Sequence, residues 1–177
     1  MAVRPVMKRF RFVSGVAILV FVLTSCTRQT TPEGLRCADP PSSEGQVESL
    51  AVLKLEPSPV AADSSADLSV ERGSVSENAV VGVAAFWECW TEEKGWVPTH
   101  VLVRGYGDRS PAVLEYDPDS NAFVESVALA VPSTYPILIP DVRPGTYRIR
   151  DEVADIVEGT PARVTGFVLV EVLGSGG

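Results

Sequence analysis

Histidine and cysteine are scarce in this chain of 177 residues, which has one His and three Cys. A zinc site is not indicated, because there is no Cys-x-x-Cys pair and no Cys/His ligand set around His100. The nucleophile-elbow pattern Gly-x-Ser-x-Gly is also absent, and catalysis by a histidine needs a positioned partner. We therefore expect no enzyme and no cofactor, and we interpret His100 as a surface or half-buried strand residue.

Basic residues are also few, with 15 Lys and Arg against 23 Asp and Glu and a net charge of −8. Four of the basic residues and none of the acidic ones precede Cys26, so residues 26–177 carry −12. A nucleic-acid partner calls for a basic patch, and anionic lipid attracts clustered Lys and Arg. We expect neither partner, and we interpret the charge as a source of solubility, with recognition of a basic partner as the alternative.

A run long enough to span a membrane, about 20 apolar residues, is missing as well. The apolar run Phe12–Leu23 is about half that length, and Ser14 and Gly15 dilute it. Basic residues precede the run and small residues follow it, which is the layout of a secretory signal. The sequence thus predicts export, with an uncleaved anchor as the alternative.

The end of this run, Leu23-Thr24-Ser25-Cys26, resembles the lipobox of bacterial lipoproteins, whose cysteine is acylated and becomes the first residue of the mature protein. The resemblance implies a signal peptide over residues 1–25 and lipidation of Cys26, with acyl chains such as palmitate. Two or three chains anchor a protein stably, whereas one is marginal. The expected location is extracytoplasmic, on the bacterial membrane; a plain secretory signal with an incidental cysteine is the alternative.

Cys37 and Cys89 remain once Cys26 is assigned to lipid. An even pair in an exported chain indicates a disulfide, and closing a loop of about fifty residues would stabilise the fold by about 4 kcal/mol. Two free thiols are the alternative. Residues 26–46 are rich in Pro, Ser, Thr and Gly and predict a flexible tether, so the disulfide would pin its second half to the domain.

The segment 47–173 predicts an all-β sandwich, because no stretch has a helical period and turn signals recur about every ten residues. The predicted strands are Val47–Glu56, Asp67–Arg72, Ala79–Trp90, Trp96–Arg104, Ala112–Tyr116, Ala122–Val131, Tyr135–Ile139, Thr146–Val153 and Arg163–Leu173.

Several of these strands carry further expectations. The apolar density of Ala79–Trp90 suits a central strand covered on both faces. Prolines confine Tyr135–Ile139 to a sheet edge. Turns at Thr91–Gly95 and Asp117–Asn121 predict two hairpins, and residues 174–177 form a disordered tail.

Two pieces of the chain, Glu88 followed by Lys94–Pro98 and the stretch Ile139–Ile149, resemble the bacterial immunoglobulin-like domains found on exported lipoproteins. The resemblance implies an immunoglobulin-like β-sandwich of about 7–9 antiparallel strands over residues 47–173. That family usually has no established activity. It implies a non-enzymatic envelope protein that presents its domain to a protein or cell-wall partner.

Pro144, Gly145 and Tyr147 indicate a tyrosine corner, in which the phenol bonds to upstream backbone. Ile149 stands where antibody domains carry the second cysteine of their inter-sheet disulfide. A Cys37–Cys89 bond would therefore be a different cross-link, between the tether and a strand. The alternative for Tyr147 is an ordinary half-buried strand residue.

The sequence contains two candidate ligand sites. Trp90 and Trp96, with the loop Gly105–Pro111, are candidates for a face that binds carbohydrate or peptidoglycan, whereas Trp87 falls on the opposite strand face and is interpreted as core. The spacing of Asp117, Asp119 and Asn121 is that of the first ligands of a calcium loop. Ala122 and Ala128 replace the required Gly and Glu, so a solvated hairpin turn is the competing interpretation.

Overall fold

The computed structural model describes residues 35–42, 51–71, 73–118, 128–131, 133–157 and 159–174. Within these ranges the chain forms strands and no helix, which confirms the all-β class. The strands are β1 (Ala51–Glu56), β2 (Val60–Ala61), β3 (Ser65–Val70), β4 (Val80–Val81), β5 (Ala84–Thr91), β6 (Gly95–Val103), β7 (Ala112–Glu115), β8 (Leu129–Ala130), β9 (Thr134–Leu138), β10 (Gly145–Val157) and β11 (Thr160–Leu173).

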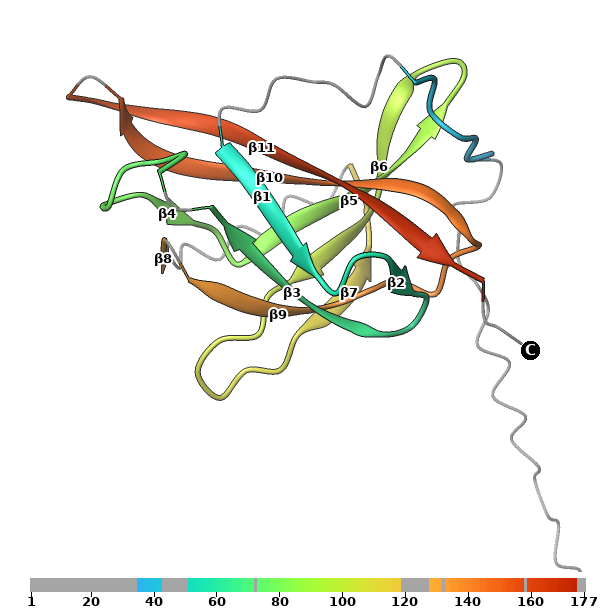
Figure 1. Cartoon of the computed structure of the whole chain (residues 1–177), viewed down its shortest axis with the longest axis horizontal. Helices are drawn as coiled ribbons and strands as arrows, with labels where there is room; N and C mark the ends of the chain where they lie inside the picture. The colour runs from blue at the N-terminus through green and yellow to red at the C-terminus, as the bar shows by residue number, and fades with distance from the viewer. Residues whose placement is uncertain are drawn as a thin grey trace, which may run out of the picture.

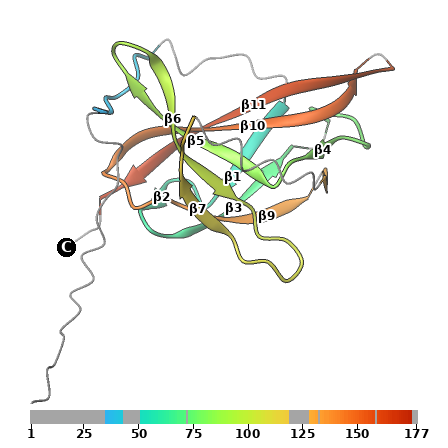
Figure 2. The same ribbon diagram turned by 180° about the vertical axis from the view of Figure 1, so that it is seen from behind.

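The strands form one curled sheet in the order β7-β6-β5-β10-β11-β1-β3-β9. Strand β4 pairs with β10 and β8, and β2 pairs with β11. All pairings are antiparallel except those of β1 and β2 with β11. The two ends of this order approach each other where the Gly105 amide donates to the Pro136 carbonyl at 2.8 Å. The sheet is therefore nearly barrel-shaped (Figures 1 and 2).

Gly105 permits this approach because it has no side chain. A Cβ at this position would lie 2.9 Å from ring atoms of both Pro111 and Pro136, closer than packed carbon atoms come. The glycine thus lets the end of β6 meet β9.

Alternation of apolar and polar residues positions most strands. In β1 every second residue is buried, including Leu53 and Leu55, as expected of a strand with one face on a core. In β5 the inward residues Ala85, Trp87 and Cys89 are fully buried. Glu88 on the other face is also buried, at 2% exposure, so the prediction that this stretch is covered on both faces holds at the centre of β5.

The hairpin predicted across Thr91–Gly95 is confirmed as β5–β6, with Gly95 at φ 72° and a register shift between Trp87 and Glu88. The edge position predicted for Tyr135–Ile139 is also confirmed, since β9 ends the strand order.

The second predicted hairpin, Ala112–Tyr116 with Ala122–Val131, stays a prediction, because residues 119–127 lie outside the described ranges. In the described part of the chain, β7 pairs with β6, and β8 pairs with β4. The amides and carbonyls of Tyr106 and Arg109 pair with each other in the loop before β7, and this loop turns the chain back onto β6.

Strands β10 and β11 are longer than predicted, at 13 and 14 residues. Beyond Ala154, the last β10 residue paired with β4, the hairpin continues as a two-stranded extension, visible at the upper left of Figure 1. We call residues 154–163 the arm. Asp155 connects the arm to the loop before β4. Its carboxylate accepts hydrogen bonds from the Ser76 amide, at 3.1 Å, and from the Ser76 hydroxyl. These bonds lower the pKa of Asp155, since they favour its charged form.

An ion pair lies inside the sheet, between Arg104 at the end of β6 and Asp151 on β10. The side chains are 2% and 1% exposed, and Arg104 Nη1 also donates to the Gly82 carbonyl at 2.7 Å. Burial raises the pKa of Asp151, and the Arg104 guanidinium opposes that rise. Because Gly82 precedes β5, this pair joins three segments of the fold.

Candidate functional site

The outer face of β6, β5, β10 and β11 carries a cluster of charged and aromatic side chains. Since Trp87 and Cys89 point inward, strand alternation places Phe86 and Glu88 outward. The strand register sets Glu88 opposite Arg148. We call the cluster the arginine–aromatic face, and its members are Phe86, Glu88, Trp96, Arg148, Arg150 and Phe167.

Glu88 is the centre of this face, and its side chain is 3% exposed. Its Oε2 accepts the Arg148 Nε at 2.7 Å and Nη2 at 2.5 Å, and its Oε1 accepts the Arg150 Nε at 2.8 Å. A buried carboxylate is tolerated only when it is paired and hydrogen-bonded. Arg150 Nη1 also donates to Glu152 Oε1 at 3.4 Å, where Glu152 is 47% exposed. Glu88 is therefore the buried anion that both cations share, and Glu152 is a second, more exposed partner of Arg150.

Aromatic rings hold both guanidinium groups in place. The Arg148 Cζ lies 4.7 Å from the centroid of the Trp96 ring and 4.4 Å from that of Phe167. The Arg150 Cζ lies 4.4 Å from the Phe86 centroid. Such stacking adds about 0.5–2 kcal/mol per contact and fixes the orientation of the planar group. Arg150 is the more accessible of the two, with 25% of its side chain exposed against 12% for Arg148.

The predicted ligand residues Trp90 and Trp96 belong to the same face but do not form an open platform. Their rings meet edge-to-face at 5.7 Å between centroids, both residues are half-buried, and Arg148 covers Trp96. Trp87 is fully buried, as strand parity predicts. Phe86 and the two arginines were missed, although the alternation of Tyr147-Arg148-Ile149-Arg150 indicates two outward cations on one strand.

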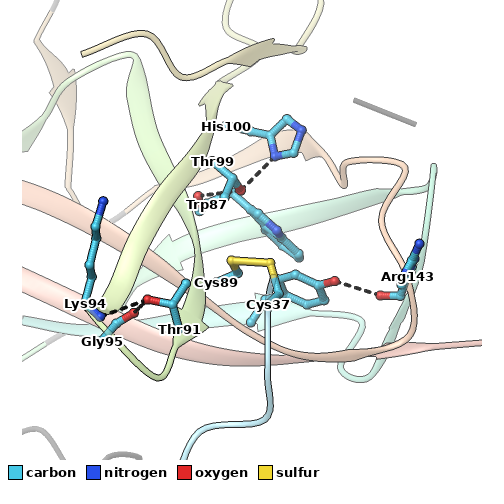
Figure 3. The surroundings of a disulfide bond; sticks show 10 residues. Cys37, Trp87, Cys89, Thr91, Lys94, Gly95, Thr99, His100 and Arg143 are labelled. Atoms are coloured by element: carbon cyan, nitrogen blue, oxygen red, sulfur yellow. Dashed lines mark hydrogen bonds between the residues drawn. A yellow bond between two sulfur atoms is a disulfide. The ribbon is translucent and has the colours of Figure 1, made fainter. Parts of the chain in front are cut away.

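At one end of the sheet a disulfide joins Cys37 to Cys89, with a Cα–Cα distance of 5.5 Å (Figure 3). This is the pair that the cysteine count predicts. The Ala38 amide donates to the Trp90 carbonyl at 2.9 Å, and Leu35 packs against the core. Residues 35–42, which we call the clasp segment, therefore lie against the domain, as predicted for the part of the tether that this disulfide would hold. The rest of residues 26–46, including Cys26, lies outside the described ranges, as does the signal segment.

Tyr147 lies beside this disulfide at the start of β10. Its hydroxyl donates to the Arg143 carbonyl at 2.9 Å, the contact that the tyrosine-corner interpretation of Pro144, Gly145 and Tyr147 expects. Its ring centroid is 5.0 Å from that of Trp87. Burial raises the pKa of Tyr147. Figure 3 shows the Trp87 ring next to the sulfur atoms and Arg143 further away.

His100, predicted at the surface or half-buried, is instead buried at 7% exposure. It pairs with the inward residue Trp87 after the register shift, so it points inward as well. Its Nδ1 is 3.0 Å from the Thr99 Oγ1, which also donates to the Trp87 carbonyl at 3.3 Å. These contacts describe a hydrogen-bonded core histidine.

The calcium interpretation remains a prediction. Asp117 is exposed, but Asp119 and Asn121 lie outside the described residues. Within the described ranges, no group of three or more His, Cys, Asp or Glu side chains is arranged to hold a metal ion.

An open pocket of about 430 Å³ lies on the arm. Its lining is mostly apolar, with Arg163 at the rim, 83% exposed and 3.7 Å from Glu152. The lining residues are Asn78, Val80, Ala154, Asp155, Ile156, Pro161, Ala162 and Arg163.

Comparisons of the chain with protein-family models, with curated proteins and with solved structures find no match. The described part of the chain contains no helix with the length and apolarity that a membrane crossing requires.

Proposed function

We propose that this chain is a bacterial envelope lipoprotein, anchored outside the cytoplasm through lipid on Cys26. Residues 47–173 form an immunoglobulin-like domain that binds a protein or cell-wall partner and catalyses no reaction. The observation that carries the binding role is the arginine–aromatic face. The anchor rests on the lipobox-like sequence before Cys26.

The strand order supports an immunoglobulin-like domain. With β1, β3 and β9 as strands A, B and E, and β5, β6, β10 and β11 as C, C′, F and G, the neighbours C′-C-F-G and A-B-E match those of that fold. Trp87 is then the buried tryptophan of strand C, and Tyr147 is the corner tyrosine at the start of strand F. Two features depart from the antibody pattern: Ile149 replaces the strand F cysteine, and the sheet is continuous.

The composition of the arginine–aromatic face favours a protein partner. Arginine and aromatic residues are enriched at the energetically important positions of protein interfaces. Arg148 and Arg150 are held by Glu88 and by aromatic rings, so little side-chain entropy is lost when a partner binds. Binding of carbohydrate or peptidoglycan through Trp90 and Trp96 is disfavoured, because those rings contact each other and Arg148.

The anchor can be tested by mass spectrometry of the membrane fraction of cells that express the full chain. We expect an N-terminal peptide that begins at Cys26 and carries acyl chains, because the lipobox-like sequence places the cleavage before that residue. Cys26→Ser should move the protein out of the membrane fraction, since a lipid anchor gains about 0.8 kcal/mol per buried CH₂. An intact Met1 terminus, or an unmodified Cys26 thiol, would exclude the proposed anchor.

The binding role can be tested with Arg150→Gln, which removes the more exposed cation and leaves Arg148 to pair with Glu88. After crosslinking in intact cells, we expect the yield of the main crosslinked partner to fall by about tenfold, as for a residue at the centre of an interface. Lys54→Gln is the matched control, because it removes an exposed cation that pairs with Glu71 at the surface, away from this face. Equal yields from the two variants, both folded, would contradict a role for this face.

A further inference from the structure

The disulfide lies between the proposed anchor and the domain, and it shortens the chain that links them. Cys37 is 11 residues from Cys26, whereas Ala51, the first residue of β1, is 25 residues away. A flexible linker has an end-to-end distance of about 5–6 Å times the square root of its length, about 18 Å for the shorter path and about 28 Å for the longer. The fully extended limits are about 40 Å and about 90 Å.

The disulfide is also attached at one end of the molecule. Cys89 lies opposite Tyr147, near the start of β10, whereas the arm ends at Val157, ten residues further along the same strand. At about 3.3 Å per residue, Tyr147 and Val157 are about 33 Å apart along β10. Figures 1 and 2 show the clasp segment beside the β5–β6 hairpin and the arm at the other end of the molecule.

The exposed charges at the clasp end are mixed. Glu92, Glu93 and Asp39 are accompanied by Lys94 and by Arg36 of the clasp segment, all exposed, so this end carries little net charge. Anionic headgroups therefore neither attract it nor repel it strongly. The short link is what keeps the clasp end nearest the membrane.

We propose that the Cys37–Cys89 disulfide orients the domain on the membrane, with the β5–β6 turn toward the bilayer and the arm with its pocket directed away from it. This inference rests on the proposed lipidation of Cys26. Among the described residues, the other attachments of the clasp segment are the Ala38–Trp90 hydrogen bond and the packing of Leu35. Neither is covalent, so the orientation depends on the disulfide.

The test uses the full chain, purified from membranes and reconstituted into vesicles whose headgroups carry an energy acceptor. A donor dye is attached through a clickable amino acid at position 94 or at position 160. The native residues there are both exposed: Lys94 lies in the β5–β6 turn, and Thr160 begins β11 in the arm. We expect energy transfer from position 94 to exceed that from position 160 by at least about threefold, because of the difference in distance along β10.

Two variants separate orientation from simple proximity. Cys37→Ser/Cys89→Ala should make energy transfer from the two positions equal, since the domain is then linked to the anchor through the longer segment, from Cys26 to Ala51. Insertion of about 14 Gly and Ser residues between Cys26 and Cys37 should lower transfer from position 94 by about half or more, through linker length alone, with the disulfide intact. This second variant keeps the test decisive if the first variant fails to fold.

Equal transfer from positions 94 and 160 in the disulfide-bonded, acylated protein would overturn the orientation and leave the proposed function standing. The mass of the Cys26 peptide is measured on the same sample. An unmodified Cys26 would overturn the proposed anchor and, with it, this inference.

Discussion

Replacing Asp151 by Val should lower the free energy of unfolding by about 3–5 kcal/mol, and replacing Arg104 by Met should have a similar effect. Each change leaves the other charged group buried, with almost no access to water. Arg104 would keep its bond to the Gly82 carbonyl, but a carbonyl does not neutralise a cation. Urea denaturation of each variant, followed by tryptophan fluorescence, measures the loss.

The double variant Arg104→Met/Asp151→Val should be much less destabilised than either single variant, because removing both charges removes the cost of burying them. A coupling energy of at least about 2 kcal/mol in the double-mutant cycle is expected for groups in direct contact. Losses that simply add would contradict the interpretation that charge burial, rather than packing, dominates at this site. Lys54→Gln serves here as a control for loss of an exposed cation, which should change stability by less than about 1 kcal/mol.

This ion pair also explains one limit of the sequence interpretation. The inward positions of β10 are Tyr147, Ile149, Asp151 and Val153, an unbroken alternation. A charged residue at the third position interrupts the apolar pattern, and the predicted strand ended at Val153, four residues before β10 ends at Val157. The partner that makes Asp151 tolerable is 47 residues away, and no local pattern reveals it.

The same limit applies to the arginine–aromatic face. Strand parity predicts which residues of one strand share a face, and it correctly separated Trp87 from Trp90. It does not predict which strands are neighbours, because pairing and register depend on the complete sheet. Glu88 and Arg148 are 60 residues apart, so their contact follows only from the β5–β10 pairing.

Features encoded locally were predicted better. Gly95 supplies the positive φ of the β5–β6 turn, and Pro136 lacks the amide that a central strand would need, which explains the edge position of β9. The sequence did not predict that β7 pairs with β6, because a turn signal marks where the chain bends and does not identify the strand that the chain then meets.

Removing the disulfide should lower the free energy of unfolding by about 4 kcal/mol in the chain-entropy model, because Cys37 and Cys89 are separated by 52 residues. The bond connects the clasp segment to a fully buried position of β5, beside Trp87 and Tyr147. Its loss frees the clasp segment in the unfolded chain and weakens its hold on this end of the folded domain. Both effects reduce stability.

The measurement compares urea denaturation of the wild type before and after reduction with that of Cys37→Ser/Cys89→Ala. Reduced wild type and the double variant should lose similar stability, because both lack the cross-link. The single variant Cys37→Ser, which leaves the buried Cys89 in place, separates loss of the cross-link from any cavity created at Cys89. A loss below about 1 kcal/mol in all three would mean that the cross-link constrains neither the folded nor the unfolded chain. The clasp segment would then be held mainly by Leu35 and Ala38.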